Sequence, residues 1–108
     1  MKVAALIDDL FFQSKVRTAA QVLGTELIFC HSAEEVPPDA ARICVDLNAT
    51  TFDGVAEIVK LRAMHQAPIT AFLSHVQVAL KERARNAGAN EVIPRSVFVE
   101  RLPEILME

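Results

Sequence analysis

The chain has 108 residues, the usual size of one domain, so we expect a single domain spanning residues 1–108. Hydrophobic residues make up 52% of the chain and only three residues are glycine, which supports a buried core and excludes a disordered or fibrous chain. The net charge is −3, with acids and bases interspersed and no basic cluster, which argues against a nucleic-acid partner.

The first two predicted elements are a strand and a helix. Residues 2–7 form a short apolar run, typical of a strand buried on both faces, and the run stops at Asp8 and Asp9. Apolar residues then recur at helical spacing over residues 11–23, and Gly24 is a natural helix end.

The next segment predicts a second strand over residues 26–30, followed by a stunted helix. Ser32 begins what resembles a capped helical turn, but Pro37 and Pro38 cut it short. Residues 42–47 then predict a third buried strand, which ends in a carboxylate.

The second half of the chain continues the alternation. Asp53 and Gly54 mark a turn and the start of a helix that runs to about His65, and residues 68–73 predict the fourth strand. The remaining expected elements are a basic helix over residues 76–87, a short fifth strand over residues 91–93 and a final helix over residues 98–107 that starts late or bends at Pro103.

Strands that alternate with helices predict an α/β fold with a parallel sheet covered on both faces. Right-handed crossovers favour a doubly wound, five-stranded sheet with a shortened second helix. No apolar run is long enough for a membrane span, and Met1-Lys2 leads directly into a strand rather than a signal peptide, so we expect a cytoplasmic protein with no membrane partner. Cys30 and Cys44 lie in apolar runs and are expected to be buried, reduced thiols.

Three carboxylates fall where the predicted strands end. Asp8 and Asp9 close the first strand, and Asp46 lies at the end of the third. Ligands bind outside the carboxyl ends of the strands in open parallel sheets, so neighbouring first and third strands would bring these acids together. Such a cluster favours a hard cation such as Mg²⁺, and a carboxylate beside that ion can accept a phosphoryl group. The alternative is that the aspartates are helix caps and turn formers.

The order and spacing of these motifs resemble the receiver domains of two-component response regulators over nearly the whole chain. The resemblance implies a flavodoxin-like receiver topology with strand order 2-1-3-4-5. It rests on Asp8-Asp9, on Asp46-Leu47-Asn48, on Phe52-Asp53-Gly54, and on Ala87-Gly88-Ala89 before the fifth strand.

Carried over by that resemblance, Asp46 is the phosphoacceptor. Asp9 binds Mg²⁺ directly, Asp8 binds it mainly through water, and Asn48 contributes its backbone carbonyl and borders the incoming water. The resemblance also implies a histidine kinase as the phosphate source. With no room for an output domain, the effect is expected to pass through protein contacts or a homodimer.

Several positions depart from the receiver pattern. Arg95 stands where receivers place the lysine of a Lys-Pro pair, and Leu73 stands where they place a hydroxyl residue, with Ser74 one residue later. Val92 replaces the aromatic switch residue, and Thr50 replaces a loop proline.

These departures leave two questions of chemistry open. Arg95 offers a planar fork, so it either holds Asp46 in a standing salt bridge or binds the phosphoryl group in a different geometry. Leu73 cannot donate a hydrogen bond, so the switch contact is lost unless Ser74 substitutes for it. His75 is expected to be a solvated loop residue.

Three functions fit the sequence. The first is a stand-alone phosphoacceptor receiver in a phosphorelay, and the second is a pseudo-receiver that binds proteins without phosphorylation. The third is an unrelated flavodoxin-like binding domain or small enzyme. Because no Ser-His-Asp arrangement and no Gly-rich phosphate loop can be defended, we expect a protein that is not an enzyme.

Overall fold

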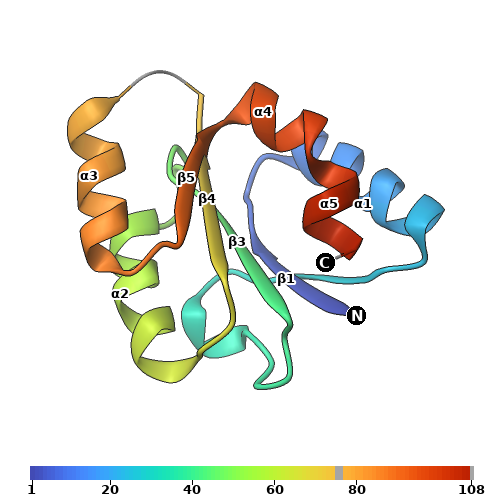
Figure 1. Cartoon of the computed structure of the whole chain (residues 1–108), viewed down its shortest axis with the longest axis horizontal. Coiled ribbons are helices and arrows are strands. Elements are labelled where there is room, and N and C mark those ends of the chain that lie inside the picture. The colour runs from blue at the N-terminus through green and yellow to red at the C-terminus, as the bar shows by residue number, and fades with distance from the viewer. Residues whose placement is uncertain (75–76, 108) are drawn as a thin grey trace.

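The computed structural model describes residues 1–74 and 77–107 and shows a five-stranded sheet with helices on both faces (Figure 1). In chain order the elements are β1 (Lys2–Leu6), α1 (Leu10–Leu23), β2 (Glu26–Phe29), the 3₁₀ turn η1 (Ala33–Glu35), β3 (Arg42–Asp46), α2 (Gly54–Met64), β4 (Ile69–Leu73), α3 (Val78–Ala87), β5 (Glu91–Pro94), α4 (Arg95–Glu100) and α5 (Leu102–Met107). The strand order is β2-β1-β3-β4-β5 and all neighbouring strands are parallel. The predicted doubly wound sheet and its order 2-1-3-4-5 are thereby confirmed.

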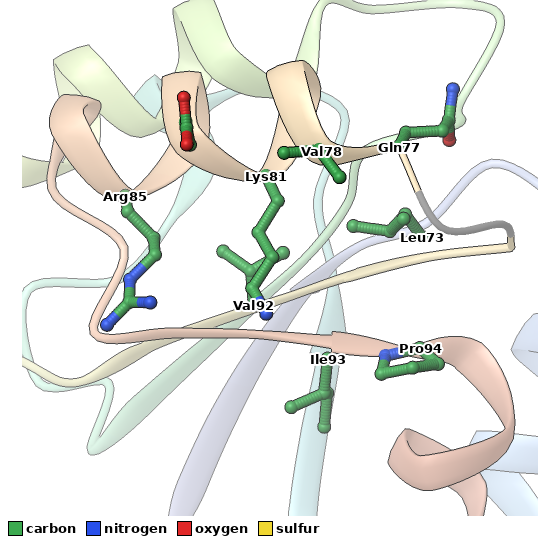
Figure 2. A pocket seen from close by; sticks show the side chains of 9 residues that line it. Leu73, Gln77, Val78, Lys81, Arg85, Val92, Ile93 and Pro94 are labelled. Atoms are coloured by element: carbon green, nitrogen blue, oxygen red, sulfur yellow. The ribbon is translucent and has the colours of Figure 1, made fainter.

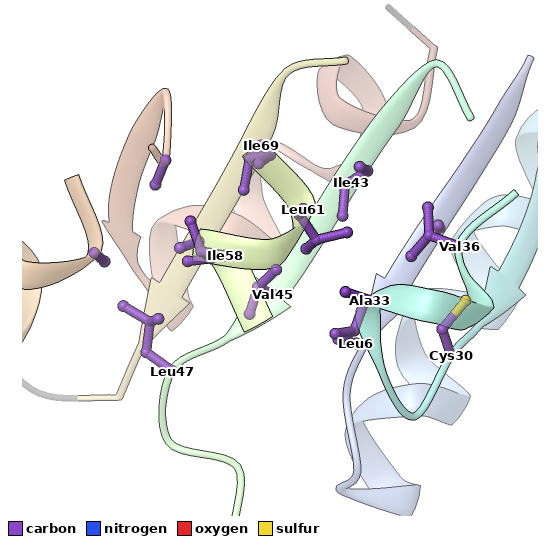
Figure 3. Packing of buried hydrophobic residues seen from close by; sticks show 14 of the residues in the cluster. Leu6, Cys30, Ala33, Val36, Ile43, Val45, Leu47, Ile58, Leu61 and Ile69 are labelled. Atoms are coloured by element: carbon purple, nitrogen blue, oxygen red, sulfur yellow. The ribbon is translucent and has the colours of Figure 1, made fainter. Parts of the chain in front are cut away.

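Two hydrophobic layers enclose the sheet. On one face Leu6, Val45 and other strand residues pack against η1, α2 and α3 (Figure 3). On the other face alternate residues such as Ala5 and Phe72 pack against α1, α4 and α5. Because both faces of the central strands are buried, their sequences are continuous apolar runs rather than alternating ones.

The predicted shortening of the second helix is also confirmed, since a single 3₁₀ turn, η1, follows β2. Pro37 and Pro38 lie directly after it, and proline cannot donate a backbone hydrogen bond to continue a helix. Glu57 of α2 connects that helix to η1. Its side chain is buried, and its carboxylate accepts a hydrogen bond from the backbone N–H of Ala33 at 2.8 Å.

The ends of α1 and α2 follow the sequence signals, whereas Ser32, which was expected to cap the turn η1, makes no side-chain capping hydrogen bond. The Asp9 carboxylate caps α1, which ends at Gly24 in the left-handed region at φ 71°, and the Asp53 carboxylate caps α2. Helix α3 is described from Val78 onward. The predicted start at Val76, like the expectation for His75, lies outside the described residues.

The prediction of one late-starting or Pro103-bent final helix is wrong. Helix α4 begins at Arg95, and a turn at Arg101 separates it from α5. Pro103 lies in the first turn of α5, where a missing N–H costs nothing. The Arg101 side chain forms ion pairs with Glu91 at 2.9 Å and with Glu104 at 3.3 Å.

Cys30 and Cys44 are buried and free, as predicted. Burial raises the pKa of the Cys30 thiol to about 11 and that of Cys44 to about 12, so both thiols stay protonated at neutral pH. In the described part of the chain, no helix has the length and apolar character that crossing a membrane requires.

Candidate functional site

The carboxyl ends of β1 and β3 bring the three predicted aspartates to one edge of the sheet. The two strands pair directly, with Ala5 opposite Cys44 and Leu6 opposite Val45. Asp46 ends β3 and is 1% exposed, and the charges of Asp8 and Asp9 act on it across the gap. The pairing of the first and third strands, on which the predicted cluster depends, is therefore confirmed.

Arg95 lies between two of these acids. Its guanidinium donates from one terminal nitrogen to Asp46 Oδ2 at 3.1 Å and from the other to Asp9 Oδ2 at 3.4 Å. Arg95 is the first residue of α4, directly after β5, so the fifth strand delivers it to the same edge. Arg95 therefore holds Asp46 in a salt bridge, which is one of the two roles that the sequence left open for this arginine. We call Asp8, Asp9, Asp46 and Arg95 the acid pocket.

Aromatic rings support the guanidinium. The Cζ atom of Arg95 lies 4.4 Å from the centroid of Phe12 and 5.7 Å from that of Phe72. Phe72 in turn stacks on Phe98 at 4.3 Å. Phe12 is buried, whereas its neighbour Phe11 is 92% exposed. Cation–π contact with these rings therefore holds the Arg95 guanidinium in place, together with its ion pairs to Asp9 and Asp46.

Asp8 faces the loop after β3 rather than Arg95. Its Oδ2 atom accepts hydrogen bonds from the backbone N–H groups of Thr50 at 2.9 Å and Thr51 at 2.8 Å, and from both hydroxyls. Burial raises the pKa of Asp8, but these hydrogen bonds outweigh it and hold the pKa below its usual value. Asp8 is therefore a fixed anion that fastens this loop to the end of β1.

The Asp46 carboxylate is the most buried group of the pocket. Burial raises its pKa, and the charges of Asp8 and Asp9 add to that effect. The backbone N–H of Asn48, at 2.8 Å from Oδ1, and the charge of Arg95 oppose the rise without cancelling it. The ionised form of Asp46 consequently depends on Arg95 for its compensating charge.

Asn48 connects the same loop to the region after β4. Its amide nitrogen donates to Gln77 Oε1 at 2.8 Å, and its side-chain oxygen accepts from the Ser74 hydroxyl at 3.0 Å and from the Ser74 backbone N–H. Leu73 is buried in the hydrophobic layer under α2 and α3. The Ser74 hydroxyl therefore points to Asn48, and neither residue provides a hydroxyl contact to Asp46.

In this structure the carboxylates predicted to bind Mg²⁺ are engaged by protein groups. Both oxygens of Asp9 and of Asp46 accept hydrogen bonds from protein groups, and one oxygen of Asp8 accepts four. Across residues 1–74 and 77–107, no three His, Cys, Asp or Glu side chains are grouped so as to hold a metal ion. The guanidinium of Arg95 supplies the positive charge instead.

A groove with a volume of about 350 Å³ lies between α3 and β5 (Figure 2). Leu73, Val92 and Pro94 give it an apolar floor, and Figure 2 shows Lys81 and Arg85 extending from α3 toward β5. We call this the α3–β5 groove. Its full lining is Leu73, Gln77, Val78, Lys81, Glu82, Arg85, Val92, Ile93 and Pro94.

Three residues of this region were not predicted from the sequence. Thr50 and Thr51 hold Asp8, and the only signal was that Thr50 replaces the usual loop proline, which frees a backbone N–H to donate. Gln77 binds Asn48, and no sequence pattern identified it because its partner lies 29 residues away.

Solved structures similar to this chain are response regulators and their receiver domains. A response regulator protein from Burkholderia pseudomallei, solved with a phosphorylated aspartic acid, a calcium ion and citrate, aligns at a TM-score of 0.82 with 18% identity, over 98% of this chain and 66% of the other. A CheY-like receiver domain protein from Methanospirillum hungatei aligns at 0.82 with 16% identity, over 95% of this chain and 87% of the other. A two-component response regulator from Clostridium difficile gives 0.82 with 16% identity, over 98% and 95%.

No protein-family profile and no curated protein sequence matches the chain. The agreement with the solved structures is therefore one of architecture, and it includes the parallel sheet, its strand order and the helices on both faces. This chain has the receiver-domain fold of two-component response regulators.

Proposed function

We propose that this protein is a pseudo-receiver, a receiver-fold domain that binds a protein partner without being phosphorylated. The observation that carries this proposal is the position of Arg95, whose guanidinium bridges Asp46 and Asp9. A metal-dependent phosphoacceptor needs carboxylate oxygens that are open to a cation. In this acid pocket an internal cation already compensates two of the three acids, and Thr50 and Thr51 hold the third.

The α3–β5 groove is the surface that we assign to the partner. Its floor is apolar, and its α3 rim carries two bases, Lys81 and Arg85, against one acid, Glu82. We therefore expect a protein segment that buries apolar side chains on the floor and presents an acidic side chain to Lys81 and Arg85. Homodimerisation, a cytoplasmic location and the absence of catalysis stay predictions.

A phosphoacceptor receiver is the second candidate, with a histidine kinase as phosphate source. It is favoured by the place of Asp46 at the end of β3 and by the similar fold of the Burkholderia protein, which was solved with a phosphorylated aspartic acid and a calcium ion. In this chain Arg95 would have to release Asp9 and Asp46, and Asp8 would have to leave the two threonines. The first candidate requires neither rearrangement.

Intact-mass spectrometry separates the two candidates. After incubation with Mg²⁺ and a small phosphodonor such as acetyl phosphate, we expect the mass of the wild-type protein to be unchanged. A receiver domain that accepts phosphate from the same donor, treated in parallel, shows that the donor is active. A phosphoryl adduct on the wild type that is missing from the Asp46→Asn variant would refute the pseudo-receiver proposal and establish the phosphoacceptor.

A further inference from the structure

Strand β2 forms an exposed edge of the sheet. Among the strands of the described residues it pairs only with β1, and β5 forms the opposite edge. Residues 30–41, which connect β2 to β3 and are all described, contain the turn η1 but no longer helix. The apolar residues of β2, Leu27, Ile28 and Phe29, are only half-buried, whereas every residue after the first in β1 and β3 is buried. Apolar surface therefore stays accessible along this edge.

Leu27 and Phe29 direct their backbone groups away from the sheet. Glu26 and Cys30 each donate a backbone N–H to β1 or to the residue before it, at 3.1 and 2.9 Å. In a parallel ladder only alternate residues of a strand hydrogen bond to the same neighbour, so the residues between Glu26 and Cys30 at odd positions face the other way. The N–H and C=O groups of Leu27 and Phe29 are therefore the donors and acceptors that this edge offers to another strand.

The β2 edge lacks the features that usually prevent strands from pairing. Such edges are commonly protected by proline or by charged side chains, above all lysine. Strand β2 contains neither proline nor lysine, and its one charged residue, Glu26, stands at its start, whereas the opposite edge strand β5 ends in Pro94. Arg17 of α1 lies over the Phe29 ring at 5.1 Å, but α1 packs on the face of the sheet and leaves the edge open.

A second copy of this chain matches the β2 edge. In an antiparallel pair with its two-fold axis at Ile28, Leu27 lies opposite Phe29 of the second copy, and each such pair exchanges two backbone hydrogen bonds. Every outward donor and acceptor of these two residues is then used in both copies. Leu27 also packs on Phe29 on one face, and Ile28 meets Ile28 on the other. Glu26 lies opposite Cys30, so no like charges meet.

We propose that the chain forms a homodimer through antiparallel pairing of two β2 strands, which joins both sheets into one continuous sheet. The pairing involves few residues, so we expect a weak dimer that forms as the concentration rises from micromolar to millimolar. The α3–β5 groove lies at the opposite edge of the sheet, so the dimer leaves both of its grooves open. A partner with two binding segments would then bind the dimer more tightly than the monomer.

An exchange of charges at Ile28 tests both the interface and its register. Because Ile28 faces its own copy across the two-fold axis, Ile28→Lys alone and Ile28→Glu alone should each weaken self-association by about tenfold, through like charges placed directly opposite each other. An equimolar mixture of the two variants places opposite charges there and should recover the association to within about threefold of the wild type. Sedimentation velocity at concentrations up to millimolar gives the dissociation constants.

A control variant and a measurement on the wild type complete the experiment. Val59→Lys adds the same charge at an exposed apolar position of α2 and should leave self-association unchanged. Urea unfolding shows whether each variant is folded. In the wild type, which needs no substitution, an isotope-filtered NOE between the Hα protons of Ile28 in a labelled and an unlabelled chain should identify the pairing directly.

Two results would overturn this dimer. The first is a wild type that stays monomeric at millimolar concentration, which would leave the β2 edge to a strand of another protein. The second is self-association that shifts the amide resonances of Lys81 and Val92 in the α3–β5 groove while those of Leu27 and Phe29 stay unchanged. No phosphodonor or partner is used, so either result leaves the proposed function as it stands.

Discussion

Replacing Arg95 with alanine is expected to lower the free energy of unfolding by about 2 to 3 kcal/mol, because it leaves the buried carboxylate of Asp46 without its compensating charge. Asp46 is 1% exposed, and the Arg95 side chain is 28% exposed, which places the expected loss below that of a fully buried pair. The loss of contact with the Phe12 and Phe72 rings adds to it. Urea unfolding monitored by circular dichroism measures the change.

A second substitution separates loss of charge compensation from loss of packing. In the Arg95→Ala background, Asp46→Asn removes the uncompensated carboxylate, and we expect it to recover a substantial part of the lost stability. Arg83→Ala, an exposed arginine on α3, is the matched control and should change stability by less than about 0.5 kcal/mol. If Arg95→Ala lowered the free energy of unfolding no more than Arg83→Ala does, Arg95 would not be the cation that the buried carboxylate of Asp46 requires.

Replacing Phe72 with alanine is expected to lower the free energy of unfolding by about 3 to 5 kcal/mol, because it opens a cavity between the sheet and the helices α1 and α4. Phe72 is fully buried, stacks on Phe98 at 4.3 Å and lies 5.2 Å from the Phe12 ring. It is also part of the surface against which the Arg95 guanidinium packs. The substitution should therefore weaken both the core and the acid pocket.

The chain contains a matched control for this change. Phe11→Ala removes the same atoms from a side chain that is 92% exposed, so its effect on the free energy of unfolding should stay within about 0.5 kcal/mol. Chemical denaturation of both variants under identical conditions gives the comparison. Equal losses of unfolding free energy for the two substitutions would mean that the cluster of Phe12, Phe72 and Phe98 contributes far less to stability than its burial indicates.

The architecture was predictable because its signals are local and repeated. Each central strand is a short apolar run buried on both faces, and each crossover helix has a start or stop residue nearby, such as Asp53 or Gly24. The double proline after residue 36 correctly predicted that the second helix would shrink to one turn. These features depend on residues within a few positions of each other, so the sequence alone expresses them.

The boundary between the two C-terminal helices was mispredicted, because it falls at Arg101, two residues before Pro103. Pro103 suggested a bend, but a proline in the first turn of a helix is tolerated. The break falls at Arg101, whose guanidinium binds Glu91 on β5. That contact depends on how the final helices lie across the sheet, which no local pattern specifies.

For the acid pocket, the sequence predicted which residues meet but not what they do there. The two explanations for the aspartates, helix cap or shared acid cluster, both apply to Asp9, which caps α1 with one oxygen and binds Arg95 with the other. The Asp8 carboxylate accepts hydrogen bonds from Thr50 and Thr51, and these contacts depend on the path of the loop after β3. The roles assigned by resemblance require carboxylate oxygens that are open to a cation, whereas in this structure both oxygens of Asp9 and of Asp46 accept hydrogen bonds from protein groups.

The most direct test of the account is a Mg²⁺ titration of the wild-type protein and of Arg95→Ala, followed by the amide resonances of Asp8, Asp9 and Asp46. If Arg95 supplies the cation of the acid pocket, the wild type should show no saturable shift at millimolar Mg²⁺, whereas Arg95→Ala should show one because its acids have lost their internal counter-charge. Saturable Mg²⁺ binding by the wild type, as tight as in the variant, would contradict the central claim that the guanidinium takes the place of a metal ion.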